Sequence, residues 1–132
     1  MGDTPKRTSE RVTGNRAART ALRDFAIGLP GAYEEFPWGE CVAKVNKKVF
    51  AFLGIDTGLS FSVKLPISGE DVLALPFTEP TGYGLGKHGW VTVSFLPGEQ
   101  PPIDVLRGWI VESYRAIAPK RLVVQLEQQS AR

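Results

Sequence analysis

The sequence predicts an α+β domain, in which an antiparallel sheet of about five strands packs against an N-terminal and a C-terminal helix. Apolar residues recur at helical spacing near both ends of the chain, and they alternate with polar residues in its middle. Short turns separate the neighbouring strand segments. Strands joined by short turns pair antiparallel, and two amphipathic helices can cover one face of such a sheet.

Length and composition predict a single domain with short extensions. The 132 residues suffice for one hydrophobic core. Residues 1–13 contain almost no apolar side chains, so we expect a disordered basic arm there. We expect the domain itself to span residues 14–127, with a polar tail at residues 128–132.

The first helix is indicated by an apolar stripe with steps of four, three and four residues. The stripe consists of Ala18, Leu22, Phe25 and Leu29. Thr13 or Asn15 can cap its start, and Pro30-Gly31 ends it. Three arginines, Arg16, Arg19 and Arg23, share another face of this helix.

Strands are predicted in the middle of the chain. Residues 41–45 and 49–53 flank the short connection Asn46-Lys47-Lys48, a pattern typical of a hairpin. Residues 59–65 alternate strictly between apolar and polar side chains, which predicts one buried and one polar face. Residues 90–95 show the same alternation.

Two further helices are expected, separated by a loop. Ser68 can cap a short helix that ends near Leu75, and residues 76–89, rich in Gly and Pro, form a loop. The last helix opens at Pro101-Pro102, because proline is tolerated in a first turn. Its inward stripe consists of Ile103, Leu106, Ile110, Ser113, Tyr114 and Ile117. Pro119 interrupts it, and Leu122, Val123 and Leu126 suggest a short further helical turn.

Charge is distributed unevenly along the chain, although its formal net value is +2. Residues 1–23 hold six Lys/Arg against two Asp/Glu, a net of +4, whereas residues 24–118 hold seven against eleven, a net of −4. Residues 119–132 hold three against one, a net of +2. A basic arm suits contacts with phosphate, and it equally suits a solvated tail.

Several chemistries are excluded by the context of their motifs. Residues 84–89 spell G-x-G-x-x-G, but a strand rather than a helix follows, which excludes a dinucleotide site. Lys87 is followed by His88 and not by Ser or Thr, which excludes a phosphate-binding P-loop. A zinc site usually needs four closely spaced Cys, His or carboxylate ligands, whereas this chain has one Cys and one His far apart. Adjacent carboxylates, as in Glu34-Glu35, point to opposite faces of an extended segment. We therefore expect no cofactor and no metal, and we expect catalysis only if His88 or these carboxylates act with partners that the sequence does not identify.

The same composition predicts a cytoplasmic protein. No apolar run approaches the roughly 20 residues of a membrane span, and the basic N-terminus does not resemble a signal peptide. Cys41 has no partner for an internal disulfide, which favours a reducing compartment.

One cluster of residues is a candidate binding surface. Tyr83, Lys87, His88 and Trp90 lie within eight residues, beside a strand whose polar face ends in Lys64. Aromatic faces can stack on bases, and nearby cations neutralise phosphate. The alternative interpretation is that Trp90 packs under a helix while Lys87 and His88 are solvated on a loop.

The motifs, taken in chain order, resemble the MmcQ/YjbR family from about Leu22 to Leu126. The most specific are Leu29-Pro30-Gly31, Glu35–Gly39, Lys64-Leu65, Gly86–Trp90 and Glu112-Ser113-Tyr114. The resemblance implies a CyaY-like arrangement and a DNA-binding protein, a label that rests on likeness of fold to a double-wing DNA-binding module. This chain departs from the family at Asn46-Lys47-Lys48, where Gly is common, and the lysines would help a wing approach phosphate.

Two functions therefore stay open. The first is DNA binding with low sequence specificity, in which cations contact phosphates and Trp90 or Tyr83 offers a stacking surface. The cations are Lys47, Lys48, Lys64, Lys87, Arg16, Arg19 and Arg23. The second is a protein- or small-ligand-binding module, with a pocket on the open sheet face near Phe36, Trp38, Lys64, Lys87 and Trp90. A monomer is the expected state in both.

Overall fold

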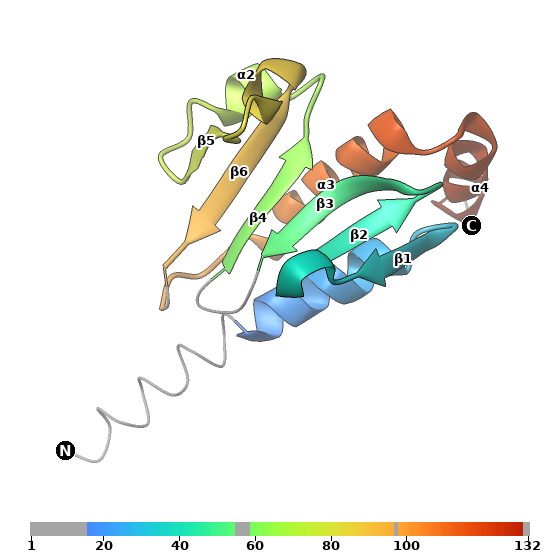
Figure 1. The fold of residues 1–132 in the computed structure, drawn as a ribbon, viewed down its shortest axis with the longest axis horizontal. Coiled ribbons are helices and arrows are strands. Elements are labelled where there is room, and N and C mark those ends of the chain that lie inside the picture. Colours follow the sequence, from blue (N-terminus) through green and yellow to red (C-terminus); the bar gives the residue numbers. More distant parts are fainter. Residues whose placement is uncertain (1–15, 55–58, 97, 131–132) are drawn as a thin grey trace, which may run out of the picture.

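The protein is an α+β domain, as predicted, with all major helices on one face of an antiparallel sheet (Figure 1). The computed structural model describes residues 16–54, 59–96 and 98–130. The predicted arm at residues 1–13, both candidate caps of the first helix and residues 131–132 lie outside this part. No helix of the described residues is long and apolar enough to cross a membrane.

The sheet has six strands in the order β1-β2-β3-β4-β6-β5, and every neighbouring pair is antiparallel. The strands are β1 (Ala32–Glu35), β2 (Cys41–Val45), β3 (Lys48–Gly54), β4 (Leu59–Lys64), β5 (Thr78–Pro80) and β6 (Trp90–Phe95). The helices are an N-terminal helix over residues 16–27, η1 (Pro37–Gly39), α2 (Gly69–Val72), η2 (Leu85–His88), α3 (Ile103–Ile117) and α4 (Lys120–Ser130).

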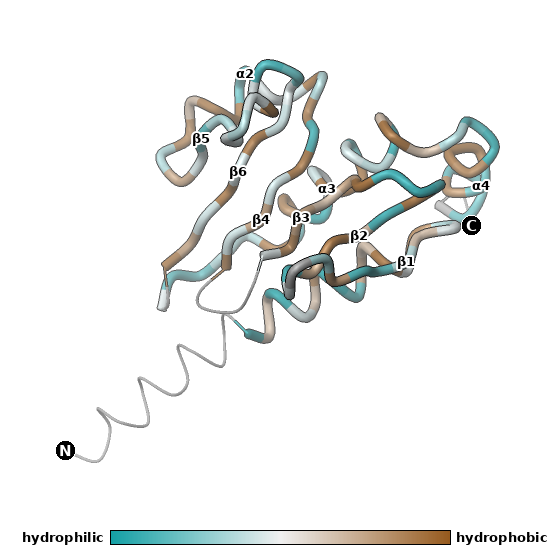
Figure 2. The backbone as a smooth tube through the Cα atoms, in the orientation of Figure 1, coloured by the Kyte–Doolittle hydropathy of each residue, from teal (hydrophilic) through white to brown (hydrophobic). Residues whose placement is uncertain are grey.

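The two faces of the sheet differ in their side chains. Leu59, Phe61 and Val63 of β4 are buried beneath the helices, as the alternation predicted, whereas Ser60 and Ser62 occupy the other face. Directly opposite residues in antiparallel strands share a face, so Ala51 lies with Val63 on the helix side. Hydrophobic residues follow the central strands, while the β2–β3 turn is hydrophilic (Figure 2).

The N-terminal helix and α3 supply the other half of the core. Ala18, Leu22 and Leu29 of the predicted stripe are buried, with Phe25 packed at the edge. Leu106, Ile110 and Tyr114 of α3 are fully buried. The Tyr114 and Phe50 rings are nearly perpendicular, with a centroid separation of 5.4 Å, and the Tyr114 hydroxyl donates to the Pro30 carbonyl at 2.6 Å. Tyr114 therefore ties α3 to the end of the first helix.

Ser113 fills a gap in the sheet where β3 and β4 diverge. These strands are in register at Ala51–Val63 and Phe52–Ser62. Beyond that point, the Ser113 hydroxyl accepts from the Lys64 N–H at 2.8 Å and donates to the Phe50 carbonyl at 2.5 Å. A buried hydroxyl from α3 thus satisfies two backbone groups that would otherwise be orphaned.

Four details differ from the sequence prediction. β1 and β5 are edge strands whose sequences, AYEE and TEP, do not alternate between apolar and polar residues, and β5 lies within residues 76–89, which were expected to be loop. The helix at α2 is only four residues long. Ser68 occupies its N-cap position but donates its hydroxyl to Glu112 instead of capping. α4 runs to Ser130, past the boundary expected at residue 127, so residues 128–130 continue a helix.

Candidate functional site

The antiparallel register gathers most of the candidate cations at one end of the sheet. β2 and β4 end there, and β3 and β6 begin there. This end, called the lysine end below, carries Lys47, Lys48, Lys64, Lys87 and His88. The β2–β3 turn lies on one side of it and η2 on the other (Figure 1). No acid among the described residues forms an ion pair with any of them.

The β2–β3 turn presents two of these lysines. Asn46 and Lys47 have positive φ angles of 50° and 67°, and the strand pair closes at Val45–Lys48. Two successive left-handed residues match the twist of a hairpin, and Asn tolerates this conformation better than most residues. Lys47 and Lys48 are both exposed. The turn therefore holds two ammonium groups at its tip.

The Gly-rich segment before β6 presents Lys87 and His88. Glycines with positive φ bracket η2, with Gly84 at 79° and Gly89 at 88°. Both side chains are exposed. Two of the three glycines of the G-x-G-x-x-G string, Gly84 and Gly89, thus serve backbone turns, and the strand β6 follows the string.

Lys64 and Trp90 are paired directly across β4 and β6 on the open face. Lys64 is half-buried, and Trp90 is only 8% exposed. The Trp90 ring meets Phe52 edge to face, with a centroid separation of 5.3 Å. Trp90 is thus a packed residue of the open face, away from the helices, and offers no free ring surface for stacking. Tyr83, in contrast, is fully exposed.

A row of hydroxyl groups continues the open face beside Trp90. The hydroxyl groups of Ser60 and Ser94 are hydrogen-bonded at 3.2 Å, and those of Ser62 and Thr92 at 2.7 Å. The Thr92 hydroxyl is also hydrogen-bonded to that of Thr81 at 3.0 Å. These groups satisfy one another, and no helix covers this face in the described part of the chain (Figure 1).

Two of the three arginines on the N-terminal helix make internal contacts. Arg19 donates to the Leu53 and Gly54 carbonyls at 3.3 and 3.0 Å. Arg23 forms a bidentate pair with Glu34 and also contacts Asp24. The hydrogen bonds from Arg23 lower the pKa of Glu34 and raise that of Arg23. Arg16 is exposed and has no such partner among the described residues.

The residues of the alternative open-face pocket do not lie together. Phe36 follows the edge strand β1, whereas Trp90 lies in β6, four strands away in the sheet order. Phe36 lines a cavity of about 330 Å³ with Arg19, Thr20, Arg23, Cys41 and Leu53. Trp38 belongs to η1, and its side chain lies outside the described part. Burial raises the pKa of the Cys41 thiol, which faces Glu34.

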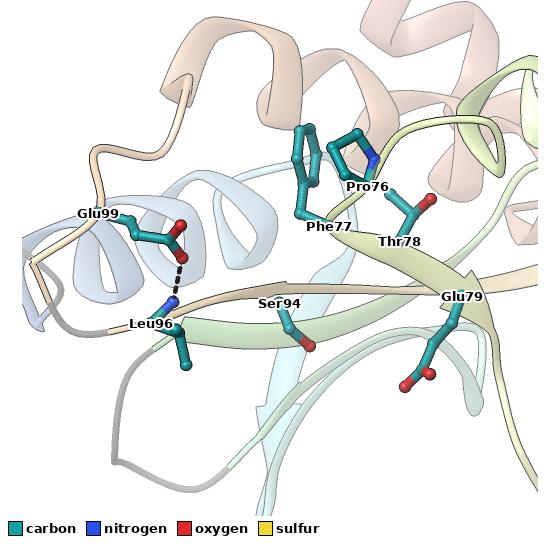
Figure 3. A pocket seen from close by; sticks show the side chains of 7 residues that line it. All are labelled: Pro76, Phe77, Thr78, Glu79, Ser94, Leu96 and Glu99. Carbon is teal, nitrogen blue, oxygen red and sulfur yellow. Dashed lines mark hydrogen bonds between the residues drawn. The ribbon is translucent and has the colours of Figure 1, made fainter.

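A second cavity, of about 400 Å³, lies at the β5 edge (Figure 3). Pro76, Phe77 and Leu96 line it together with Thr78, Glu79, Ser94 and Glu99. The Glu99 carboxylate accepts from the Leu96 N–H. This cavity contains none of the candidate cations, and its two carboxylates make it unsuited to an anion.

The described residues offer no metal cluster. No group of three or more His, Cys, Asp or Glu side chains within them could hold a metal ion. Glu34 and Glu35 point to opposite faces, as expected, and pair with Arg23 and Lys44 respectively.

The loop between β4 and α2 also lies at the lysine end, although none of its residues was predicted to be part of the site. The Glu112 carboxylate accepts from the Ile67 and Ser68 N–H groups at 2.9 Å each, and from the Ser68 hydroxyl at 2.6 Å. Ile67 is 85% exposed. An apolar residue in a turn after Pro66 was the available sequence signal, and Glu112 lies too far along the chain to be paired with it.

Comparisons with known proteins agree with the fold. A family model described as YjbR matches residues 27–116. The chain is similar to the crystal structure of Deinococcus radiodurans protein DR2400, which contains the family-model domain DUF419. The two share 30% sequence identity over 83% of this chain and 85% of that chain, with a TM-score of 0.62. No curated protein sequence matches.

Proposed function

The chain belongs to the YjbR family, and we propose that it is a non-catalytic protein that binds DNA at the lysine end of its sheet. The family resemblance seen in the sequence is thereby confirmed. The proposed binding is tolerant of sequence, needs no cofactor and takes place in the cytoplasm, with the chain as a monomer.

The carrying observation is the placement of four lysines on three separate segments at one end. Lys47 and Lys48 come from the β2–β3 turn, Lys64 from β4 and Lys87 from η2. Each lacks an ion-pair partner among the described residues. Unpaired ammonium groups on a common end suit the closely spaced phosphates of a nucleic acid.

Lysine contacts also explain the proposed tolerance of sequence. An ammonium group is a compact charge on a flexible stem, without the planar fork that arginine presents to a base edge. Phosphate contacts position a protein on DNA but carry no sequence information. Arg19 and Arg23 are held in internal contacts and are not part of the proposed surface.

Acidic residues at the same end limit the expected affinity. Glu70 and Asp71 of α2 follow the loop that begins at Leu65, and both are exposed. Their repulsion of phosphate opposes the lysines. We therefore expect detectable binding at low salt and little at high salt.

The second candidate function is a protein- or small-ligand-binding module. The uncovered sheet face, with its hydroxyl row beside the Phe52–Trp90 pair, favours this alternative. It predicts a partner whose affinity depends on Thr92 and Ser62 and is nearly insensitive to salt, because these groups are neutral.

A salt titration tests the proposal. A labelled DNA duplex is titrated with the protein at several salt concentrations. Four phosphate contacts should give a slope of log K against log[salt] of about −4, with similar affinities for unrelated sequences. An absence of binding at low salt would contradict DNA binding and leave the second candidate.

A further inference from the structure

Ile67 is an exposed apolar side chain on a fixed backbone. It is 85% exposed, although large aliphatic side chains are usually buried. The carboxylate of Glu112, a residue of α3, accepts hydrogen bonds from the N–H groups of Ile67 and Ser68. Burial of Glu112 disfavours its ionisation, but its hydrogen bonds with Ser68 and Ile67 outweigh this and lower its pKa. The backbone at Ile67 is therefore anchored by a carboxylate.

Tyr83 is a second exposed hydrophobic side chain on a constrained turn. It is fully exposed and has a φ of 58°, the left-handed region, between Gly82 and Gly84. A bulky residue in this conformation is uncommon. A Cβ placed on Gly84 would lie 3.5 Å from Cε of Lys87, so the Lys87 stem lies close to this turn.

Backbone contacts bring the two segments side by side. The Leu65 N–H donates to the Gly89 carbonyl at 2.8 Å, and Gly89 also lies close to Pro66. Ile67 therefore lies two residues after Leu65, while Lys87 and His88 directly precede Gly89. The lysine end thus combines two exposed apolar side chains with cations on adjoining segments.

We propose that the lysine end binds unpaired, single-stranded nucleic acid in preference to duplex, with bases contacting Tyr83 and Ile67. This inference rests on the proposed function and names its substrate class. Unpaired bases expose their faces to an aromatic ring, whereas the bases of a duplex are stacked on each other. Lys64 and Lys87 neutralise the neighbouring phosphates. Trp90 cannot fill this role, because its ring is buried.

An anionic membrane surface would also attract lysines and apolar side chains. Interfacial binding generally uses an amphipathic helix with an extended apolar face. The helical segments that directly follow Ile67 and Tyr83 in the chain, α2 and η2, have four residues each. Two isolated side chains fit contacts with individual bases better.

The experiment compares a single-stranded oligothymidine with a hairpin duplex of equal charge, at one low salt concentration. The proteins are the wild type, Tyr83→Asn, Tyr83→Phe, Ile67→Ser and the control Val105→Ser, which alters an exposed residue of α3. Asn suits the left-handed turn, so its effect does not come from a weakened backbone. Tyr83→Phe retains the aromatic ring.

The wild type should prefer the single strand. Tyr83→Asn should weaken single-strand binding by roughly tenfold, on the scale of one lost base–aromatic stack, and change duplex binding by less than about twofold. Ile67→Ser should act in the same direction, while Tyr83→Phe and Val105→Ser should match the wild type.

Other outcomes overturn the inference in distinguishable ways. The single-strand preference would be refuted, and nucleic-acid binding retained, if the wild type bound both probes with equal affinity. The same conclusion would follow if Tyr83→Asn lost equal affinity for the single strand and for the duplex. Binding of neither probe would refute the proposed function as well. Sedimentation with vesicles of anionic phospholipid, without binding of either probe, would assign the surface to a membrane.

Discussion

Lys64 and Trp90 lie directly opposite each other on β4 and β6, yet one is half-exposed and the other is buried. Trp90 packs edge to face on Phe52, while Lys64 is the last residue of β4, at the sheet end where η2 leads into β6. The pair marks the border between a packed part of the open face and the proposed binding surface.

Trp90→Ala should strongly destabilise the fold. Loss of a buried tryptophan ring costs about 3–5 kcal/mol of the free energy of unfolding, because a cavity remains beside Phe52. Denaturant midpoints measure this cost. Iodide should quench Trp90 weakly, as judged by comparing the wild type with Trp90→Phe, since Trp38 and Trp109 also emit. A midpoint unchanged in Trp90→Ala would show that the ring is not packed.

Ser113→Ala should destabilise the protein more than its size suggests. The substitution leaves the Lys64 N–H and the Phe50 carbonyl without their partner in the buried gap between β3 and β4. Each buried N–H or carbonyl group that is left without a partner costs about 1–3 kcal/mol of the free energy of unfolding. Ser94→Ala is the matched control, because Ser94 is exposed and should cost much less. Equal midpoints for the two variants would contradict the bridging role.

Glu112 should make part of the stability depend on pH. The pKa of Glu112 is lowered in the folded protein, so its contribution is complete above the ordinary glutamate pKa, about 4.3. The contribution is lost as pH falls through the folded value. Glu112→Gln should reduce the free energy of unfolding at neutral pH by about 1–3 kcal/mol.

The difference in free energy of unfolding between Glu112→Gln and the wild type should shrink as both proteins are acidified below pH ~4. Denaturant unfolding across that range measures it, with Glu127→Gln on α4 as the exposed control. A deficit that stays constant with pH would mean that the Glu112 charge does not stabilise the loop.

Local patterns sufficed to predict most of the fold. The alternation in β4 and β6 and the stripes of the two long helices reflect burial on one face, which sequence spacing reports directly. The strands β1 and β5 were not predicted, because a short edge strand is specified by the strand that it pairs with and not by a pattern of its own. Ser113 was placed correctly in the inward stripe of α3, but its hydroxyl acts on groups 49 and 63 residues away.

The candidate site was predictable only in part, for the same reason. Lysines in a hairpin turn and a Gly-rich loop can be recognised locally, and the register then places them at one end. The internal contacts of Arg19 and Arg23 depend on β3 and β1, far along the chain. The anchoring of Ile67 by Glu112 spans 45 residues and leaves no local pattern.

Lys87→Ala should separate binding from stability. Lys87 is exposed and has no ion pair among the described residues, so the denaturant midpoint should change little. DNA affinity at low salt should fall by about fivefold, and the magnitude of the salt slope should fall by about 1. A loss of stability as large as that of Trp90→Ala would show that Lys87 has a structural role.

The most direct test of DNA binding at the lysine end replaces Lys47, Lys48 and Lys87 together by Ala. The control replaces Arg16 by Ala, because Arg16 is an exposed cation near the opposite end of the sheet, where Arg19 contacts the end of β3. Both proteins are titrated with a labelled duplex and a labelled single strand at several salt concentrations. For the triple variant we predict a salt slope near −1, and for the control a slope and affinity close to those of the wild type. Unchanged binding by the triple variant, or an equal loss in the control, would contradict the assignment of the DNA-binding surface.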